Sequence, residues 1–192
     1  MIDIGKTVPR RRNTFLKVIG SRALWLAGWR ISGRIPDESK FVLTGGPHTS
    51  NWDFIVALMS VWALELDVHW IGKHTIFRWP FRGLFIYFGG IPVDRRNPGT
   101  LFRDVLRGFQ SQDGFVLALS PEGTRSKVAR LKPGFHRIAR KARVPIIPAG
   151  VDFGTKTIHY GDLIQPGEDV DATAARLMAF WSDFEPRHPD QF

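Results

Sequence analysis

The chain has 192 residues, which suits one domain, and 43% of them are hydrophobic, which is enough to bury a core. This composition excludes a disordered or fibrous protein. The sequence has no cysteine, which excludes disulfide bonds, thiolate catalysis and cysteine-based metal sites, while its net charge of +9 indicates an anionic partner.

The basic charge is concentrated in the first 34 residues, which carry eight Lys or Arg residues and one Asp. Residues 13–31 are expected to form a helix whose apolar residues, including Trp25 and Trp29, gather broadly on one side. Such a helix is typical of an interfacial helix in the headgroup plane of a membrane, although a core-packing helix can carry the same pattern. We therefore expect a basic amphipathic membrane-interfacial arm over residues 1–34, followed by a folded domain over residues 35–192.

We expect no membrane-spanning segment and no signal peptide. The longest apolar run, residues 54–64, is well short of the roughly 20 residues that a span needs. The apolar stretch after Arg12 is interrupted by Lys17 and Arg22, and it has no evident cleavage site. A membrane contact is therefore expected to be peripheral.

The rest of the chain alternates predicted strands and helices. Strands are expected over residues 41–44, 68–71, 91–93, 115–119, 146–151 and 156–159, and helices over 52–65, around 76–78 and 81–88, and over 99–110, 134–142 and 171–183. Asn51 or Ser50 is the expected N-cap of the first of these helices, and Asp171 that of the last. This alternation predicts an α/β fold, with a mostly parallel twisted sheet flanked by helices.

His48 lies on a loop between a predicted strand and a predicted helix, at the sheet edge where α/β proteins bind ligands. The spacing to Asp53 lets the carboxylate reach one imidazole nitrogen, so that the other nitrogen can accept a proton. This spacing alone is weak evidence, because a helix-capping loop with a solvated histidine has the same residues.

A second predicted strand, residues 115–119, ends in the segment Ser-Pro-Glu-Gly-Thr-Arg-Ser. Here Arg125 suits a bidentate phosphate contact, and Gly123 lets a backbone amide approach an anion closely. The alternative is a surface turn in which Glu122 and Arg125 form an ordinary pair.

Two further segments have a similar position. Residues 89–96 contain a short predicted strand that is followed by Asp94, Arg95 and Arg96. Residues 144–150 contain a predicted apolar strand bracketed by prolines, which plain core packing also explains. From Arg125 to Arg143 there are eight basic residues and no acidic one, which fits either an anionic ligand or a solvated helix face.

These four segments, in this order and spacing, resemble the glycerophospholipid acyltransferase family over roughly residues 40–152. The family motif Asn-His-x-Ser-x-x-Asp is matched at His48, Ser50 and Asp53, with Pro47 in place of Asn. The motif Ile-Asp-Arg is matched at residues 93–95, and the motif Phe-Pro-Glu-Gly-Thr-Arg-Ser at residues 121–126, with Ser120 in place of Phe. The fourth motif matches residues 144–148, and Lys73, Pro80 and Gly83 also resemble the family.

The resemblance implies that residues 35–192 are an acyltransferase domain that moves a fatty acyl group from a thioester directly to a lipid hydroxyl. It implies that His48 is the general base and that Asp53 orients it. It also implies a set of substrate-binding residues: Glu122, Gly123, Thr124, Arg125, Arg95, Lys73 and Ser50.

The acceptor implied first is 1-acyl-glycerol-3-phosphate, which would give phosphatidic acid. Another lysolipid, such as a lyso-aminolipid, stays open because Pro47 and Ser120 depart from the family motifs. The expected co-substrate is acyl-CoA or acyl-carrier protein, with no cofactor and no metal. We expect the protein to lie peripherally on the cytoplasmic face of a membrane, against an anionic surface.

Three other classes compete with this interpretation. A metal-dependent hydrolase could use His48, Asp53, His69 and His74, but their spacing matches no common metal motif. A non-catalytic lipid-binding module would need the basic arm but neither His48 nor Asp53. Nucleic-acid binding is indicated only by the charge, and no recognition motif accompanies it.

Overall fold

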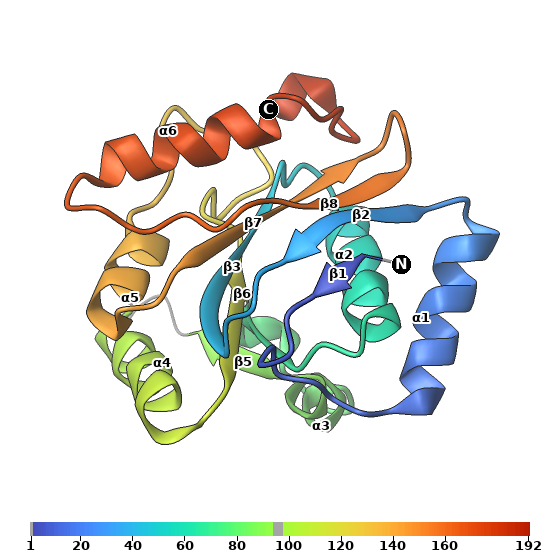
Figure 1. Ribbon diagram of the computed structural model, residues 1–192, viewed down its shortest axis with the longest axis horizontal. Coiled ribbons are helices and arrows are strands. Elements are labelled where there is room, and N and C mark those ends of the chain that lie inside the picture. The colour runs from blue at the N-terminus through green and yellow to red at the C-terminus, as the bar shows by residue number, and fades with distance from the viewer. Residues whose placement is uncertain (1, 94–97) are drawn as a thin grey trace.

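The structure, a computed structural model, describes residues 2–93 and 98–192. It confirms the predicted fold class, because a twisted and mostly parallel sheet is covered by helices on both faces (Figure 1). The strands are β1 (Asp3–Ile4), β2 (Arg30–Ile35), β3 (Lys40–Gly46), β4 (Val68–Lys73), β5 (Gly90–Val93), β6 (Phe115–Leu119), β7 (Ile146–Asp152) and β8 (Thr157–Tyr160). The α-helices are α1 (Thr14–Leu26), α2 (Asn51–Ala63), α3 (Arg82–Tyr87), α4 (Pro98–Ser111), α5 (Gly134–Ala142) and α6 (Val170–Trp181), and the 3₁₀ helices are η1 (His74–Ile76) and η2 (Pro189–Gln191).

The order of the strands brings the sequence motifs to one edge of the sheet. Within the described residues the order is β1-β2-β8-β7-β3-β6-β4-β5, and every neighbouring pair is parallel except β7 and β8. Because β3, β6, β4 and β5 are adjacent and parallel, their carboxyl ends meet at the same edge. The loops after Gly46 and Leu119, which carry His48 and Glu122, therefore lie side by side.

Each face of the sheet has its own hydrophobic core. On one face, α5 and α6 contribute Phe135 and Trp181 to a core that also includes residues of α4. On the other face, α1 and α2 contribute Leu24 and Val56. Since α2 is packed on this second core, its first turn is held at the edge of the sheet where the motif loops end.

The helix predicted over residues 13–31 is wrong beyond Leu26. Gly28 has a φ of +75°, a conformation that favours glycine, and it breaks the helical path. The chain then forms β2, where the Arg30 amide donates to the Lys156 carbonyl at 2.9 Å. Trp29 consequently packs edge-on against Phe153, with 5.1 Å between the ring centroids, and is not on the helix.

The N-terminal residues also contribute to the sheet, since β1 pairs with β2 and β2 pairs with β8. The interfacial role of residues 1–34, and the division of the chain at residue 34, stay predictions. Within the described residues, no helix is both long enough and apolar enough to span a bilayer.

The other predicted elements are found, with ends that shift by a few residues. Residues 134–142 and 115–119 match α5 and β6, and Ser50 is confirmed as the N-cap of α2. Asp171 is not the N-cap of the last helix, because the Asp169 carboxylate accepts the Asp171 amide and caps α6 two positions earlier.

Candidate active site

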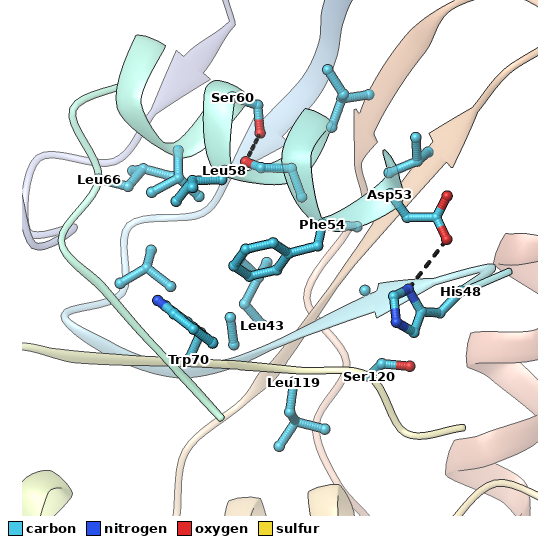
Figure 2. A pocket seen from close by; sticks show the side chains of 18 of the residues that line it. Leu43, His48, Asp53, Phe54, Leu58, Ser60, Leu66, Trp70, Leu119 and Ser120 are labelled. Carbon is cyan, nitrogen blue, oxygen red and sulfur yellow. Dashed lines mark hydrogen bonds and ion pairs between the residues drawn. The ribbon is translucent and has the colours of Figure 1, made fainter. Parts of the chain in front are cut away.

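The side chains of His48 and Asp53 are in contact at the N-terminus of α2. Nδ1 of His48 lies 3.2 Å from Oδ2 of Asp53, and the dashed line in Figure 2 marks this contact. Because an ionised carboxylate can only accept, this contact favours the imidazole tautomer with the proton on Nδ1 and the lone pair on Nε2. The His48 side chain is 27% exposed and Asp53 is buried, so the carboxylate is shielded while the imidazole stays accessible.

Local backbone geometry explains why Asp53 stands at this position. Oδ2 of Asp53 accepts the amides of Thr49 and Ser50 at 2.7 and 2.8 Å. The Ser50 hydroxyl in turn accepts the Trp52 amide at 2.9 Å, so Ser50 and Asp53 form a capping box. The same carboxylate oxygen thus caps the N-terminus of α2 and contacts the imidazole of His48.

Glu122 reaches the same loop from the neighbouring strand. Its carboxylate oxygens accept the backbone amide of His48 at 3.1 and 3.3 Å, although the two residues are 74 positions apart. Burial raises the pKa of Glu122 to about 7, and the negative charge of Asp53 adds to this, whereas the His48 amide and imidazole lower it. Glu122 is therefore poised to gain or lose a proton near neutral pH.

The turn after Glu122 is tied to α2 by a side-chain contact. Nη1 of Arg125 donates to Oδ1 of Asn51, which places a guanidinium beside the first residue of α2. Gly123 has a φ of +63°, and a Cβ there would lie 2.6 Å from Nζ of Lys132. The positive φ favours glycine at this turn, and the exposed Arg125 and Thr124 lie next to it.

The remaining predicted substrate residues have different positions. Lys73 ends β4 and is exposed at the same edge of the sheet as His48. Ser50 is buried and acts as a helix cap, so its substrate role stays a prediction. Arg95, together with Asp94, lies outside the described residues.

An apolar cavity of about 210 Å³ extends from His48 beneath α2. In Figure 2, Leu66 and Trp70 lie on the side of this cavity away from His48, and Phe54 lies between these two residues and His48. Its lining is largely aliphatic and aromatic, and includes Leu43, Ala57, Val61, Val68, Ile71, Ala118 and Val151. Such a lining suits a hydrocarbon chain better than a polar ligand.

Sequence reasoning missed several residues of this site. Asn51 was considered only as a helix cap. Its contact with Arg125 arises because the fold brings the turn after β6 next to α2, which no local sequence pattern shows. The hydroxyls of Ser60 and Tyr160 are 2.8 Å apart and both residues line the cavity. Burial raises the pKa of Tyr160 to about 12, so its hydroxyl stays protonated.

The basic run of residues 125–143 is partly used in the fold itself. Arg130 contacts the Asp171 carboxylate, with Nε 2.9 Å from Oδ1, and Arg140 lies 3.7 Å from Glu168. The other histidines considered as metal ligands lie in separate places: His69 stacks on Phe115, and His74 bonds the Val93 carbonyl. Within residues 2–93 and 98–192, no three His, Cys, Asp or Glu side chains gather as metal ligands.

Comparison with known proteins identifies the class. The acyltransferase family model matches residues 30–152. The chain is 30% identical over 147 residues to a 1-acyl-sn-glycerol-3-phosphate acyltransferase of Cocos nucifera, covering 72% of this chain and 46% of that protein. It is 26% identical over 147 residues to the enzyme of the same name from Limnanthes douglasii, covering 72% of this chain and 51% of that protein. The chain thus spans about half the length of these relatives.

A solved structure shows the same fold. The crystal structure of PlsC, a 1-acyl-sn-glycerophosphate acyltransferase from Thermotoga maritima, superposes with a TM-score of 0.65 at 18% identity, covering 88% of this chain and 76% of that one. The family match and the names of the two relatives together show that the chain belongs to the glycerophospholipid acyltransferase family.

Proposed function

We propose that this protein transfers a fatty acyl group from a thioester to the free hydroxyl of a lysophospholipid. The observation that carries the proposal is the contact between His48 and Asp53 at the mouth of an apolar cavity. A base held by a buried carboxylate beside a chain-sized apolar space is what acyl transfer to a lipid requires.

In the proposed reaction, Nε2 of His48 takes the proton of the acceptor hydroxyl as its oxygen attacks the thioester carbonyl. The carbon–sulfur bond then breaks, and the proton passes from His48 to the leaving thiolate. Asp53 keeps the imidazole in the required tautomer and stabilises its charged form. The acyl group thus passes directly from donor to acceptor, without a covalent intermediate on the protein.

The cavity is proposed to hold an acyl chain beneath α2. Each buried methylene contributes about 0.8 kcal/mol, so even a short stretch of chain would be held firmly. The reacting carbonyl would then stand near His48, with the hydrocarbon directed toward Trp70.

We propose 1-acyl-glycerol-3-phosphate as the acceptor and phosphatidic acid as the product. Support comes from the names of the two relatives and from Arg125 and Lys73, two exposed cations at the edge of the sheet that carries His48. Gly123 and Thr124 would offer backbone and hydroxyl contacts beside Arg125, and Arg95 is proposed from the motif alone.

Two other outcomes are distinguishable. Another lysolipid, such as a lyso-aminolipid, is favoured by the departures from the family motifs at Pro47 and Ser120. A non-catalytic lipid-binding module would need the apolar cavity but not the pair of His48 and Asp53. The same proposal includes acyl-CoA or acyl-carrier protein as the donor. It also includes a location of the protein on the cytoplasmic face of an anionic membrane.

The test is an assay of the purified chain with a panel of lysolipids and isotope-labelled acyl-CoA or acyl-carrier protein, with products identified by mass spectrometry. Labelled phosphatidic acid from 1-acyl-glycerol-3-phosphate, absent with folded His48→Ala protein, is the expected result. Product from a different lysolipid would change the acceptor. Equal product from the wild type and His48→Ala would remove the catalytic proposal.

A further inference from the structure

Residues 76–87, which we call the aromatic segment, expose an unusual amount of apolar surface. They include η1 in part and α3, and they connect β4 to β5. Trp79 is 92% exposed and Phe81 is 57% exposed, and Ile76, Leu84, Ile86 and Tyr87 are exposed as well. Several large apolar side chains exposed on one short segment commonly mark an interaction site.

The opposite side of the aromatic segment is firmly packed. Phe77 is buried, and its ring and that of Phe85 lie 5.6 and 6.0 Å from the ring of Trp70. Trp70 itself lines the cavity that begins at His48. The exposed side chains therefore project from an anchored base, and that base is part of the cavity wall.

The charged side chains within the aromatic segment itself are all positive. Arg78 and Arg82 are exposed on either side of Trp79, and no Asp or Glu occurs between Asp67 and Asp94. The guanidinium of Arg11 lies 4.3 Å from the ring centre of Tyr87, which places one basic N-terminal residue against α3. Exposed apolar side chains accompanied by Arg78, Arg82 and Arg11 complement an anionic lipid surface.

We propose that the aromatic segment is a membrane-contact element that inserts Trp79 and Phe81 into the headgroup region of a bilayer containing anionic lipid. Tryptophan is the residue most favoured at that depth, and Arg78 and Arg82 would meet the lipid phosphates. An acidic protein would be recognised chiefly through its charge, whereas here apolar side chains outnumber the cations. The contact is additional to the arm of residues 1–34, and it would turn the Trp70 side of the cavity toward the bilayer.

The test is co-sedimentation with phosphatidylcholine vesicles prepared with and without phosphatidylglycerol. Trp79→Ala should weaken binding to both kinds of vesicle by about tenfold, the effect of removing one large apolar side chain from the interface. Arg78→Gln together with Arg82→Gln should weaken binding only to vesicles with phosphatidylglycerol, about fivefold for each charge, and should reduce the salt dependence. Brominated lipid should quench tryptophan fluorescence of the wild type more than that of Trp79→Phe.

Met178→Ala is the matched control, because Met178 is another exposed apolar residue and lies on α6, which Figure 1 shows at the opposite end of the molecule from α3. It should bind vesicles like the wild type. Turnover of detergent-dispersed substrate should be the same in Trp79→Ala and the wild type, which separates this proposal from that of acyl transfer. Unchanged vesicle binding by folded Trp79→Ala would overturn the proposal. So would a wild-type dimer that Trp79→Ala converts to a monomer, or loss of carrier-protein binding with vesicle binding kept.

Discussion

The carboxylate of Glu122 accepts the backbone amide of His48 at 3.1 Å. This contact joins the loop after β6 to the loop after β3, and it fixes the main chain of the proposed base rather than its ring. It also leaves a carboxyl group with a pKa near 7 in the wall of the active site, because burial disfavours its charged form.

The stability of the protein should therefore depend on pH through Glu122. The unfolded chain releases this proton near pH 4.5, whereas the folded protein keeps it to about pH 7. The stabilising contribution of the protonated group is thus complete below the lower value and is lost as pH rises through the higher one. Urea unfolding between about pH 4 and pH 8 should show wild-type stability falling relative to Glu122→Gln. A difference between the two proteins that is constant with pH would contradict this assignment.

Asp53→Asn should lower turnover severely while leaving the fold largely intact. Asparagine can still accept the capping amides through its carbonyl oxygen, but it cannot stabilise a charged imidazole. Losing general-base catalysis outright, as in His48→Ala, should lower kcat by about 10²–10⁴. Circular dichroism checks the fold, and Asp53→Ala should in addition lose about 1 kcal/mol of stability with the helix cap. Full turnover by Asp53→Asn would show that no orienting charge is needed.

Arg125→Ala should weaken the apparent affinity for a phosphate-bearing acceptor by about tenfold or more, because a charge-assisted hydrogen bond is lost. The comparison is between lysolipids with and without a phosphomonoester. Arg130→Ala is the control, since Arg130 is also exposed but contacts Asp171 instead of α2. An equal loss for both lysolipids would separate Arg125 from phosphate recognition.

Filling the cavity should shorten the acyl chains that the protein uses. Ala57 lies on α2 and lines the cavity, so Ala57→Leu should reduce the use of long-chain donors more than that of short-chain donors. Competition between labelled donors of different lengths measures the shift. Ala175→Leu, on the exposed side of α6, should leave the profile unchanged. The same chain-length profile in Ala57→Leu as in the wild type would place the acyl chain elsewhere.

The basic arm should hold the protein on anionic vesicles in a salt-sensitive way. Arg10 and Arg11 are poor test positions, because Arg10 donates to the Leu64 carbonyl and Arg11 covers Tyr87. Arg12 and Arg22 are exposed, and replacing both with Gln should weaken binding about fivefold for each charge at low salt. Arg176→Gln, on α6, should bind as the wild type does, and equal binding by all three proteins would remove the arm as an anchor.

The sequence predicted what depends on local pattern. His48 and Asp53 are five positions apart on a strand–helix loop, so their contact follows from the spacing, and Ser50 as a cap follows from its side chain. The end of α1 was missed because Trp29 and Ile31 continue the apolar helical pattern. Residues 30–35 become a strand through pairing with β8, which lies far along the chain, and with the short strand β1.

Contacts between segments far apart in the chain could not be predicted from the sequence for the same reason. The approach of Glu122 to His48, and of Arg125 to Asn51, depends on β6 lying beside β3, an order that propensity does not encode. The prediction of the N-cap of α6 was wrong by two positions, because Asp169 and Asp171 have the same side chain and either could serve as the cap. The cavity is lined by residues of α2 and of several strands, so no single segment of the sequence predicts it.

One oxygen of Asp53 holds both the first turn of α2 and the imidazole of His48. The first turn of the helix and the active site therefore become ordered together. Fraying of that turn would release His48 before the sheet melts. Amide hydrogen exchange at Thr49 and Ser50 thus reports on the readiness of the site in the absence of any lipid. A protein warmed just enough to lose protection at these two amides would be folded by most measures and already inactive.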